Sequence, residues 1–134
     1  MIFHPTESRI FAIVDWELST LGHPYADLAY QCMQWRLPNT GISKGLDDID
    51  CGALGIPSEA EYVETYCRRT GRDGISNWTF CLAFSFFRLA SIVQGVMKRS
   101  LDGNASSTSA TQIGKMARPL AQAAMDLIEG SSKC

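Results

Sequence analysis

The sequence carries little net charge of either sign, since 12 lysine and arginine residues are set against 14 aspartate and glutamate residues. The resulting formal charge of −2 lacks the basic excess that nucleic-acid binding requires, so we expect no nucleic-acid partner. Glycine (11) and proline (5) are not in excess, which excludes collagen-like and low-complexity classes. The 134 residues, 46% of them hydrophobic, suffice for one domain with a buried core.

Signals for export, membrane insertion and cysteine cross-linking are also scarce. No basic region opens the chain, and Glu7 follows too soon for the apolar core of a signal peptide to develop, so we predict no secretory signal. The longest apolar run, residues 80–97, is short for a membrane span and contains Arg88 and Gln94, which favours a buried helix and no membrane partner. None of the five cysteines forms a C-x-x-C pair, which disfavours disulfide and zinc frameworks. We therefore expect reduced thiols and a cytoplasmic location.

One segment near the N-terminus is strand-like. Residues 10–14 form a run of β-branched and aromatic side chains that is too short for a helix and shows no polar alternation. This pattern predicts a strand buried on both faces. Residues 1–3 are apolar, and the turn-forming residues 4–8 separate them from this strand, so a short β-hairpin is expected.

The remainder of the chain predicts helices. Pro24 suits the first turn of a helix whose apolar stripe is Leu28, Cys32 and Trp35 and which ends at Pro38. Four glycines and an acidic cluster make residues 39–56 a predicted loop.

Three further helices are expected after this loop. Ser58 and Glu61 form a capping box for the first of them, which runs to Gly71. The second, residues 78–100, is apolar nearly all round and is predicted to be the central buried helix, with Arg88 paired to a buried carboxylate or carbonyl. Pro119 is expected to kink or restart the last helix, and residues 131–134 to form a disordered tail.

The chemistry-bearing feature is Asp15, which ends the predicted strand and is followed by Trp16 and Glu17. Ligands prefer the carboxyl ends of strands, and positions 15 and 17 of an extended chain point to the same side. Two carboxylates so placed suit Mg²⁺ bound to substrate phosphates. The alternative is that Asp15 caps a turn and Glu17 faces solvent, and the pattern by itself does not separate the two.

Three short motifs carry a resemblance to a known family. I-V-D-W-E (13–17), G-H-P (22–24) and D-L-A (27–29) resemble the metal-binding segment of the aminoglycoside phosphotransferase and choline kinase-like family, which has a protein kinase-like fold. N-W (77–78) and F-S-F-F-R (84–88) resemble a subgroup found alone in bacteria or fused to acyl-CoA dehydrogenase domains. The resemblance covers essentially the whole chain and implies a mainly α fold with a short N-terminal β-hairpin.

The resemblance implies roles for three carboxylates. Asp15 corresponds to the aspartate that holds Mg²⁺ against the phosphates of ATP. Glu17 supports a second metal or its waters, with an outward surface carboxylate as the alternative. Asp27 braces the catalytic loop by hydrogen bonds, and the competing interpretation is a plain first-turn helix aspartate. The implied partners are a nucleotide and a small molecule with an acceptor hydroxyl, and the fusion to acyl-CoA dehydrogenases hints at a hydroxyacyl acceptor.

Several parts of such a phosphotransferase have no counterpart in this sequence. There is no glycine-rich phosphate loop, no strand lysine and no H-G-D catalytic loop. We therefore interpret residues 1–130 as the C-terminal lobe of an ATP- and Mg²⁺-dependent phosphotransferase, inactive as an isolated fragment and missing its N-terminal lobe. The alternative is a non-catalytic helical binding module on a degenerate kinase-like scaffold.

Overall fold

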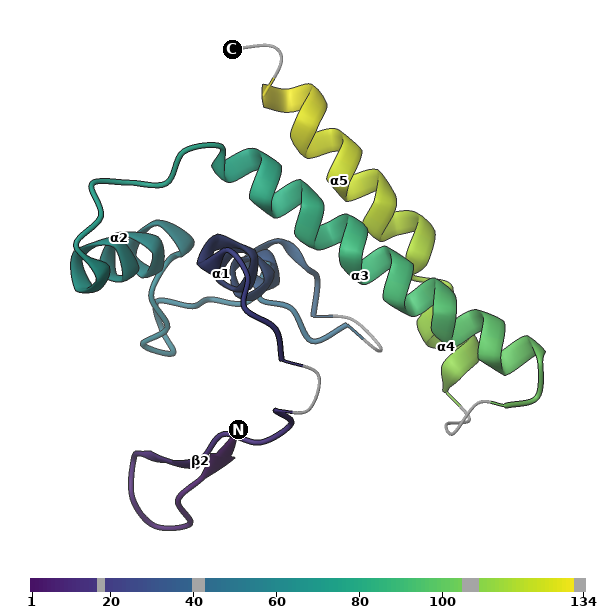
Figure 1. Cartoon of the computed structure of the whole chain (residues 1–134), viewed down its shortest axis with the longest axis horizontal. Coiled ribbons are helices and arrows are strands. Elements are labelled where there is room, and N and C mark those ends of the chain that lie inside the picture. Colours follow the sequence, from purple (N-terminus) through teal and green to yellow (C-terminus); the bar gives the residue numbers. More distant parts are fainter. Residues whose placement is uncertain (17–18, 40–42, 105–108, 132–134) are drawn as a thin grey trace.

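The chain folds as a short β-hairpin followed by a helical body (Figure 1). The computed structural model describes residues 1–16, 19–39, 43–104 and 109–131. The mainly helical composition and the N-terminal hairpin agree with the prediction from the sequence. The elements are β1 (Ile2–Phe3), β2 (Ile10–Ala12), α1 (Pro24–Cys32), the 3₁₀ helix η1 (Met33–Arg36), α2 (Glu59–Thr70), α3 (Trp78–Leu101), α4 (Ala110–Gly114) and α5 (Ala117–Ser131).

Helix α2 begins and ends where its sequence signals lie. The Ser58 hydroxyl accepts a hydrogen bond from the Glu61 backbone at 3.2 Å, and the Glu61 carboxylate accepts one from the Ser58 backbone at 2.8 Å. This backbone donor lowers the pKa of Glu61. Gly71 closes the helix in the left-handed conformation, with φ of 65°. The predicted capping box and glycine stop are confirmed.

The predicted break near Pro119 is also confirmed. Helix α4 ends at Gly114 and α5 begins at Ala117, so Pro119 lies in the first turn of α5, where a backbone donor is not needed. At its other end, α5 continues to Ser131, one residue into the predicted tail, because a single glycine costs a helix only about 1 kcal/mol. The remaining tail, residues 132–134, lies outside the described residues.

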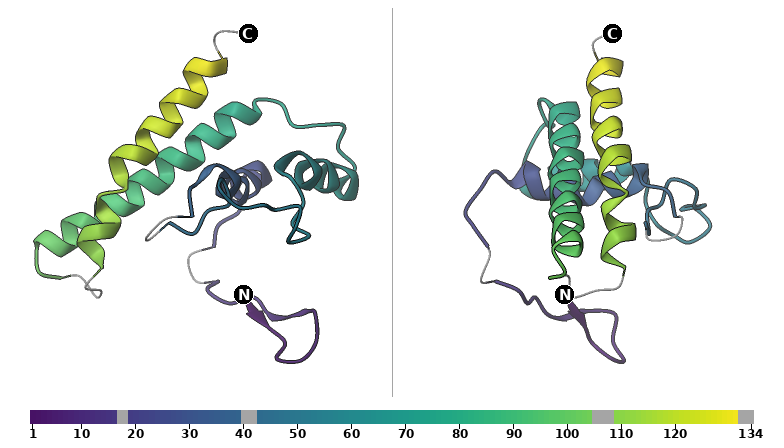
Figure 2. Two further views of the ribbon diagram at one scale, coloured as in Figure 1. Left: turned by 180° about the vertical axis from the view of Figure 1, so that it is seen from behind. Right: turned by 90° about the vertical axis from the view of Figure 1, so that its right-hand side faces the viewer.

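Helix α3 is the element against which the others pack. It lies alongside α5 and crosses α1 (Figures 1 and 2), and it also contacts α4. Phe86 and Leu82, each 1% exposed, occupy the centre of its buried face. One core cluster joins α3 to η1 and α5, and a second joins it to α1. The buried members of the two clusters are Met33, Leu37, Ala83, Phe86, Ala90, Val93, Leu120 and Ala124, and Leu28, Ala29, Cys32 and Leu82.

The opposite face of α3 is exposed, so its predicted burial on nearly all sides is wrong. Phe80 and Phe87 are 67% and 59% exposed. The described helices cover only one side of α3, and apolar composition alone does not supply a second covering layer. Arg88 lies on the exposed side, with its guanidinium 4.9 Å from the centre of the Tyr30 ring, in place of the expected buried partner.

The hairpin contradicts the predicted burial as well. Phe11 and Ile13 are 65% and 54% exposed, because the hairpin has only two strands and extends away from the helical body (Figure 2). Its register is irregular, with Ile2 opposite Ala12 and Phe3 opposite Ile10.

By length and composition, α3 is the one helix in the described part of the chain that could cross a membrane. That observation is weak on its own, since central helices of soluble proteins meet the same criterion. In the structure, α1, α4 and α5 pack on one face of α3, and its opposite face is exposed.

After α1 and η1, the chain turns back over the end of η1 and is bonded to it. The backbone N–H groups of Gly45, Leu46 and Asp47 donate to the carbonyls of Pro38, Gln34 and Leu37, at 2.8 to 3.2 Å. These bonds hold residues 43–47 against the end of η1. A side chain at Gly45 would overlap the backbone carbonyl of Leu37, so the close approach requires glycine.

We predict that Gly45→Ala lowers the free energy of unfolding by about 1–3 kcal/mol, because the added methyl group forces the two segments apart. Gly74→Ala is the matched control, since a methyl group there meets nothing within 4 Å. Urea denaturation of both variants measures the difference. Equal stability of the two variants would contradict the tight approach.

Candidate functional site

Asp15 lies three residues beyond β2 and has an unusual backbone conformation. Its φ is 74°, in the left-handed region, and it is exposed. Aspartate tolerates this region better than most residues, but a non-glycine residue there still costs free energy. Conformations of this kind concentrate at ligand and metal sites. The unusual backbone conformation therefore makes Asp15 a candidate site residue.

Hydrogen bonds on both sides of Asp15 maintain this turn. The Trp16 indole N–H donates to the Ile13 carbonyl at 2.7 Å. The Ser19 backbone and hydroxyl both donate to the Trp16 carbonyl, at 3.0 and 2.7 Å. None of these bonds uses the Asp15 carboxylate, which has no hydrogen-bond partner among the described residues. The carboxylate does not cap the turn, so it is available to an external ligand.

Of the two other predicted site residues, the structure describes Asp27 but not Glu17. Glu17 lies outside the described residues. Asp27 is exposed in the first turn of α1, where a negative charge is favourable, and its carboxylate has no hydrogen-bond partner in the described part of the chain. The bracing role expected of Asp27 needs a catalytic loop that this sequence does not contain, so it stays a prediction.

His23 caps α1 and serves as the turn residue that its position before Pro24 suggests. Its Nδ1 accepts a hydrogen bond from the Tyr25 backbone at 3.3 Å, and its ring packs edge-on against Tyr25 at 4.5 Å. The guanidinium of Arg72, just after α2, lies 5.2 Å from the centre of the Tyr25 ring. These contacts fix the start of α1 relative to the end of α2.

The donor set can be tested against the metal that the motif implies. No group of three His, Cys, Asp or Glu side chains in the described ranges could hold a metal ion. Mg²⁺ in nucleotide sites is commonly held by one or two carboxylates, with phosphate oxygens and waters completing its shell. An exposed, unpartnered Asp15 fits one ligand position of such a nucleotide-bound ion. The described residues by themselves do not form a complete ion cage.

A charged cluster away from Asp15 connects three helices. The Glu59 carboxylate accepts from the Arg36 guanidinium at 3.0 Å and from the Trp78 indole at 3.0 Å. Burial, with a smaller contribution from the charge of Glu59, raises the pKa of the nearby Cys32 thiol to about 12. Cys32 is therefore a neutral packing residue and not a nucleophile.

The raised pKa makes stability depend on pH in the alkaline range. Above pH 9 the Cys32 thiol ionises in the unfolded chain but stays protonated in the folded chain, so the free energy of unfolding falls as pH rises toward 12. Between pH 8 and 10, we expect the wild type to lose about 1–2 kcal/mol more stability than Cys32→Ala. Urea denaturation under reducing conditions tests this, and parallel losses in both proteins would disprove it.

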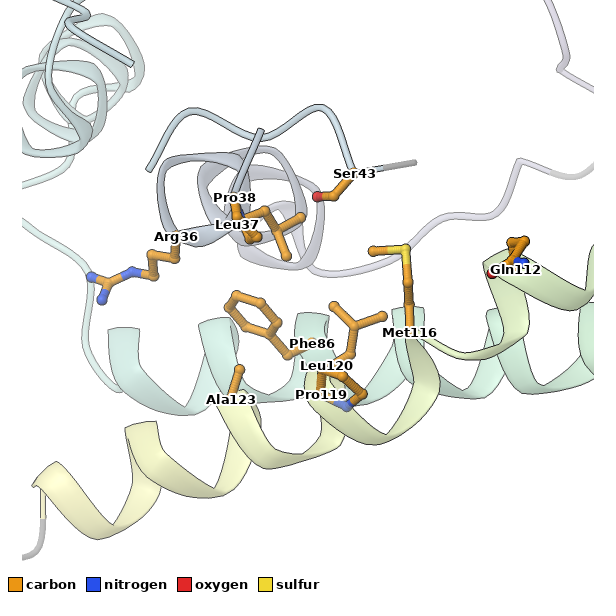
Figure 3. Close-up of a pocket in the computed structure, with 10 residues that line it drawn as sticks. All are labelled: Arg36, Leu37, Pro38, Ser43, Phe86, Gln112, Met116, Pro119, Leu120 and Ala123. Carbon is orange, nitrogen blue, oxygen red and sulfur yellow. The ribbon is translucent and has the colours of Figure 1, made fainter. Parts of the chain in front are cut away.

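Sequence reasoning did not find a cavity of about 520 Å³ between the end of η1, α3 and α5 (Figure 3). Ser43, Phe86 and Leu120 line it. These residues are far apart in the sequence, and Phe86 is the one of the three that belongs to a motif, F-S-F-F-R (84–88). Gly45 lies close to this wall, but the sequence does not reveal why a glycine is needed there. The reason becomes clear only in the fold, where Gly45 lies against the Leu37 backbone.

The short hairpin, the exposed carboxylate that follows it and the helical body agree with the phosphotransferase family that the motifs indicate. Residues 1–84 match the model of the phosphotransferase enzyme family, and the chain belongs to this family.

Individual relatives agree with this family and with the predicted subgroup. Acyl-CoA dehydrogenase family member 10 of Mus musculus is 50% identical over 127 residues, which is 94% of this chain and 12% of that protein. Acyl-CoA dehydrogenase family member 11 of Homo sapiens is 42% identical over 130 residues, or 95% of this chain and 16% of that protein. The chain thus spans less than a fifth of the length of these curated relatives.

A solved structure gives the same result for the fold. A protein from Ralstonia eutropha JMP134, named as an aminoglycoside phosphotransferase, is 50% identical and superposes with a TM-score of 0.88. The match covers 96% of this chain and 39% of that one. It confirms the predicted fold class, a mainly helical C-terminal lobe of a protein kinase-like fold with a short N-terminal β-hairpin.

Proposed function

We propose that this chain forms the C-terminal part of an ATP- and Mg²⁺-dependent phosphotransferase that acts on a hydroxyl group of a small molecule. The observation that carries the proposal is the Asp15 carboxylate, which is exposed, unpartnered in the described structure and placed by a left-handed turn. Membership of the phosphotransferase enzyme family supplies the reaction class.

In this proposal Asp15 holds the metal ion, and its neighbours keep the carboxylate in position. Bound Mg²⁺ neutralises negative charge on the nucleotide phosphates, which is the main electrostatic demand of phosphoryl transfer. The bonds made by Trp16 and Ser19 lie on either side of Asp15 and do not use its carboxylate, which leaves the carboxylate for the ion. Glu17 supports a second ion or its waters, and Asp27 is a positioning residue for the catalytic loop.

The remaining catalytic parts lie in sequence that this chain does not contain. A glycine-rich loop and a lysine would grip the phosphates, and the aspartate of an H-G-D loop would activate the acceptor hydroxyl. The curated relatives are named as acyl-CoA dehydrogenase family members, and on this ground we propose a hydroxyacyl compound as the acceptor. Because phosphoryl transfer depends on all these groups being positioned together, the isolated chain should not catalyse it.

We predict that Asp15→Ala, made in a protein with the complete kinase-like domain, lowers Mg²⁺-dependent phosphoryl transfer from ATP by about 10²-fold or more. The fold should persist, since the turn bonds do not use the carboxylate. Asp47→Ala, which removes another exposed aspartate, is the matched control and should retain activity. ADP formation is the measurement, and unchanged turnover in Asp15→Ala would refute the metal assignment.

For the 134-residue chain by itself, we expect no saturable rise in melting temperature when Mg²⁺ and ATP are titrated together. One carboxylate, without the groups that bind the phosphates, holds Mg²⁺ and ATP too weakly to stabilise the folded state over the unfolded state. A thermal-shift titration, with Mg²⁺ alone as the control, measures this. A clear saturable shift would show that the chain binds the nucleotide without the other parts.

A further inference from the structure

The cavity between η1, α3 and α5 has the size and lining of a small-molecule site. Its volume of about 520 Å³ lies within the usual range for ligand pockets. Figure 3 shows Phe86 reaching into it from α3 and Leu120 from α5, with Leu37 on the opposite wall. These side chains make the wall predominantly apolar, which favours an apolar ligand body.

One polar atom in this wall has no partner. Ser43 is 7% exposed and lines the cavity, and its hydroxyl has no hydrogen-bond partner in the described part of the chain. Buried hydroxyls are nearly always hydrogen-bonded, because an unpaired one loses its bonds to water without replacement. The backbone bonds of residues 45–47 hold the adjoining chain against η1, so Ser43 is kept at the cavity. The hydroxyl is therefore a fixed, unused hydrogen-bonding group.

The charge around the cavity restricts the ligand further. Among the described residues, no aspartate, glutamate, histidine or lysine lines it. The one charged lining residue, Arg36, is already paired with Glu59 at 3.0 Å. A cation would meet no counter-charge in the wall, and an anion would have to compete with Glu59 for Arg36. A neutral ligand meets neither obstacle.

We infer that this cavity binds a neutral small molecule with an apolar body and one hydroxyl or carbonyl group, which forms a hydrogen bond with the Ser43 hydroxyl. The apolar body lies against Phe86 and Leu120. The site is separate from Asp15 in its residues, and the inference does not depend on phosphoryl transfer.

Three probes of similar shape test this inference: benzyl alcohol, toluene and protonated benzylamine. Each is titrated into the isotope-labelled chain, and binding is followed by two-dimensional NMR. We expect saturable shifts centred on residues 36–38, 43, 116 and 120 with benzyl alcohol and toluene, and none there with benzylamine. Absence of saturable shifts at these residues with both neutral probes would overturn the proposal.

Ser43→Ala isolates the hydrogen bond. The ratio of benzyl alcohol affinity to toluene affinity should fall by about fivefold in this variant, because only benzyl alcohol can bond to the hydroxyl. The melting temperature of the unliganded variant should be unchanged or raised, since the substitution removes an unpartnered buried hydroxyl. A lower melting temperature together with an unchanged affinity ratio would show a structural role for Ser43 and overturn the assignment.

A second pair of variants tests the cavity without altering Ser43. Ala123→Met places a larger side chain at a lining position, whereas Ala121→Met makes the same change on the exposed face of α5. We expect the first to weaken binding of both neutral probes at least about tenfold by occupying their space, and the second to leave binding unchanged. Equal affinities in the two variants would contradict the location. Shifts at Met116 and Leu120 that follow protein concentration without any probe would assign the cavity to a second copy of the chain instead.

Discussion

The fold depends on the burial of one face of α3. Phe86 and Leu82 are almost fully buried there, and the helices before and after α3 meet on this face. Removing a large apolar side chain from such a position typically costs about 3–5 kcal/mol, a large part of the stability of a small domain. Because α1, η1 and α5 all share this surface, their relative positions follow from how each packs on α3.

The carboxylate site obeys a different constraint. Asp15 belongs to a hairpin that extends away from the helical body, and the turn around it is held by bonds within residues 13–19. Its local geometry therefore does not require the core. The two parts are connected through the start of α1, where His23 caps the helix and Asp27 lies in the first turn. A turn with local hydrogen bonds, joined to a separately packed helical body, can present a carboxylate to a ligand held by other segments.

Exposed apolar surfaces occur both in the hairpin segment and in the helical body. Phe11 and Ile13 of the hairpin segment and Phe80 and Phe87 of α3 are exposed, although their sequence context predicts burial. Apolar composition reports a tendency to leave water, and it carries no information about which surface provides the cover. The relatives are much longer than this chain, which matches only 39% of the solved bacterial structure.

Much of the local structure could be predicted from the sequence, because its causes are local. The capping box of Ser58 and Glu61, the glycine stop at Gly71 and the break before Pro119 each depend on neighbouring residues. The D-W-E and D-L-A motifs likewise indicated the family, since their spacing is visible in one dimension.

Tertiary structure decided what depends on distant residues. The cavity lies where η1 and α5 approach α3, and the Ser43 hydroxyl is brought to its wall by a segment whose next residues, 45–47, bond back to residues 34–38. The left-handed conformation of Asp15 is a local feature, but the sequence did not predict it, since aspartate only tolerates that region and does not specify it. The sequence by itself determined the two ends of α2, the break before α5, the family and the identity of the exposed carboxylate, whereas α1 ends at Cys32 and not at the predicted Pro38. Only the packing of the elements on α3 decided which apolar faces are covered and where a ligand-sized space remains, because those depend on surfaces brought together from far apart in the chain.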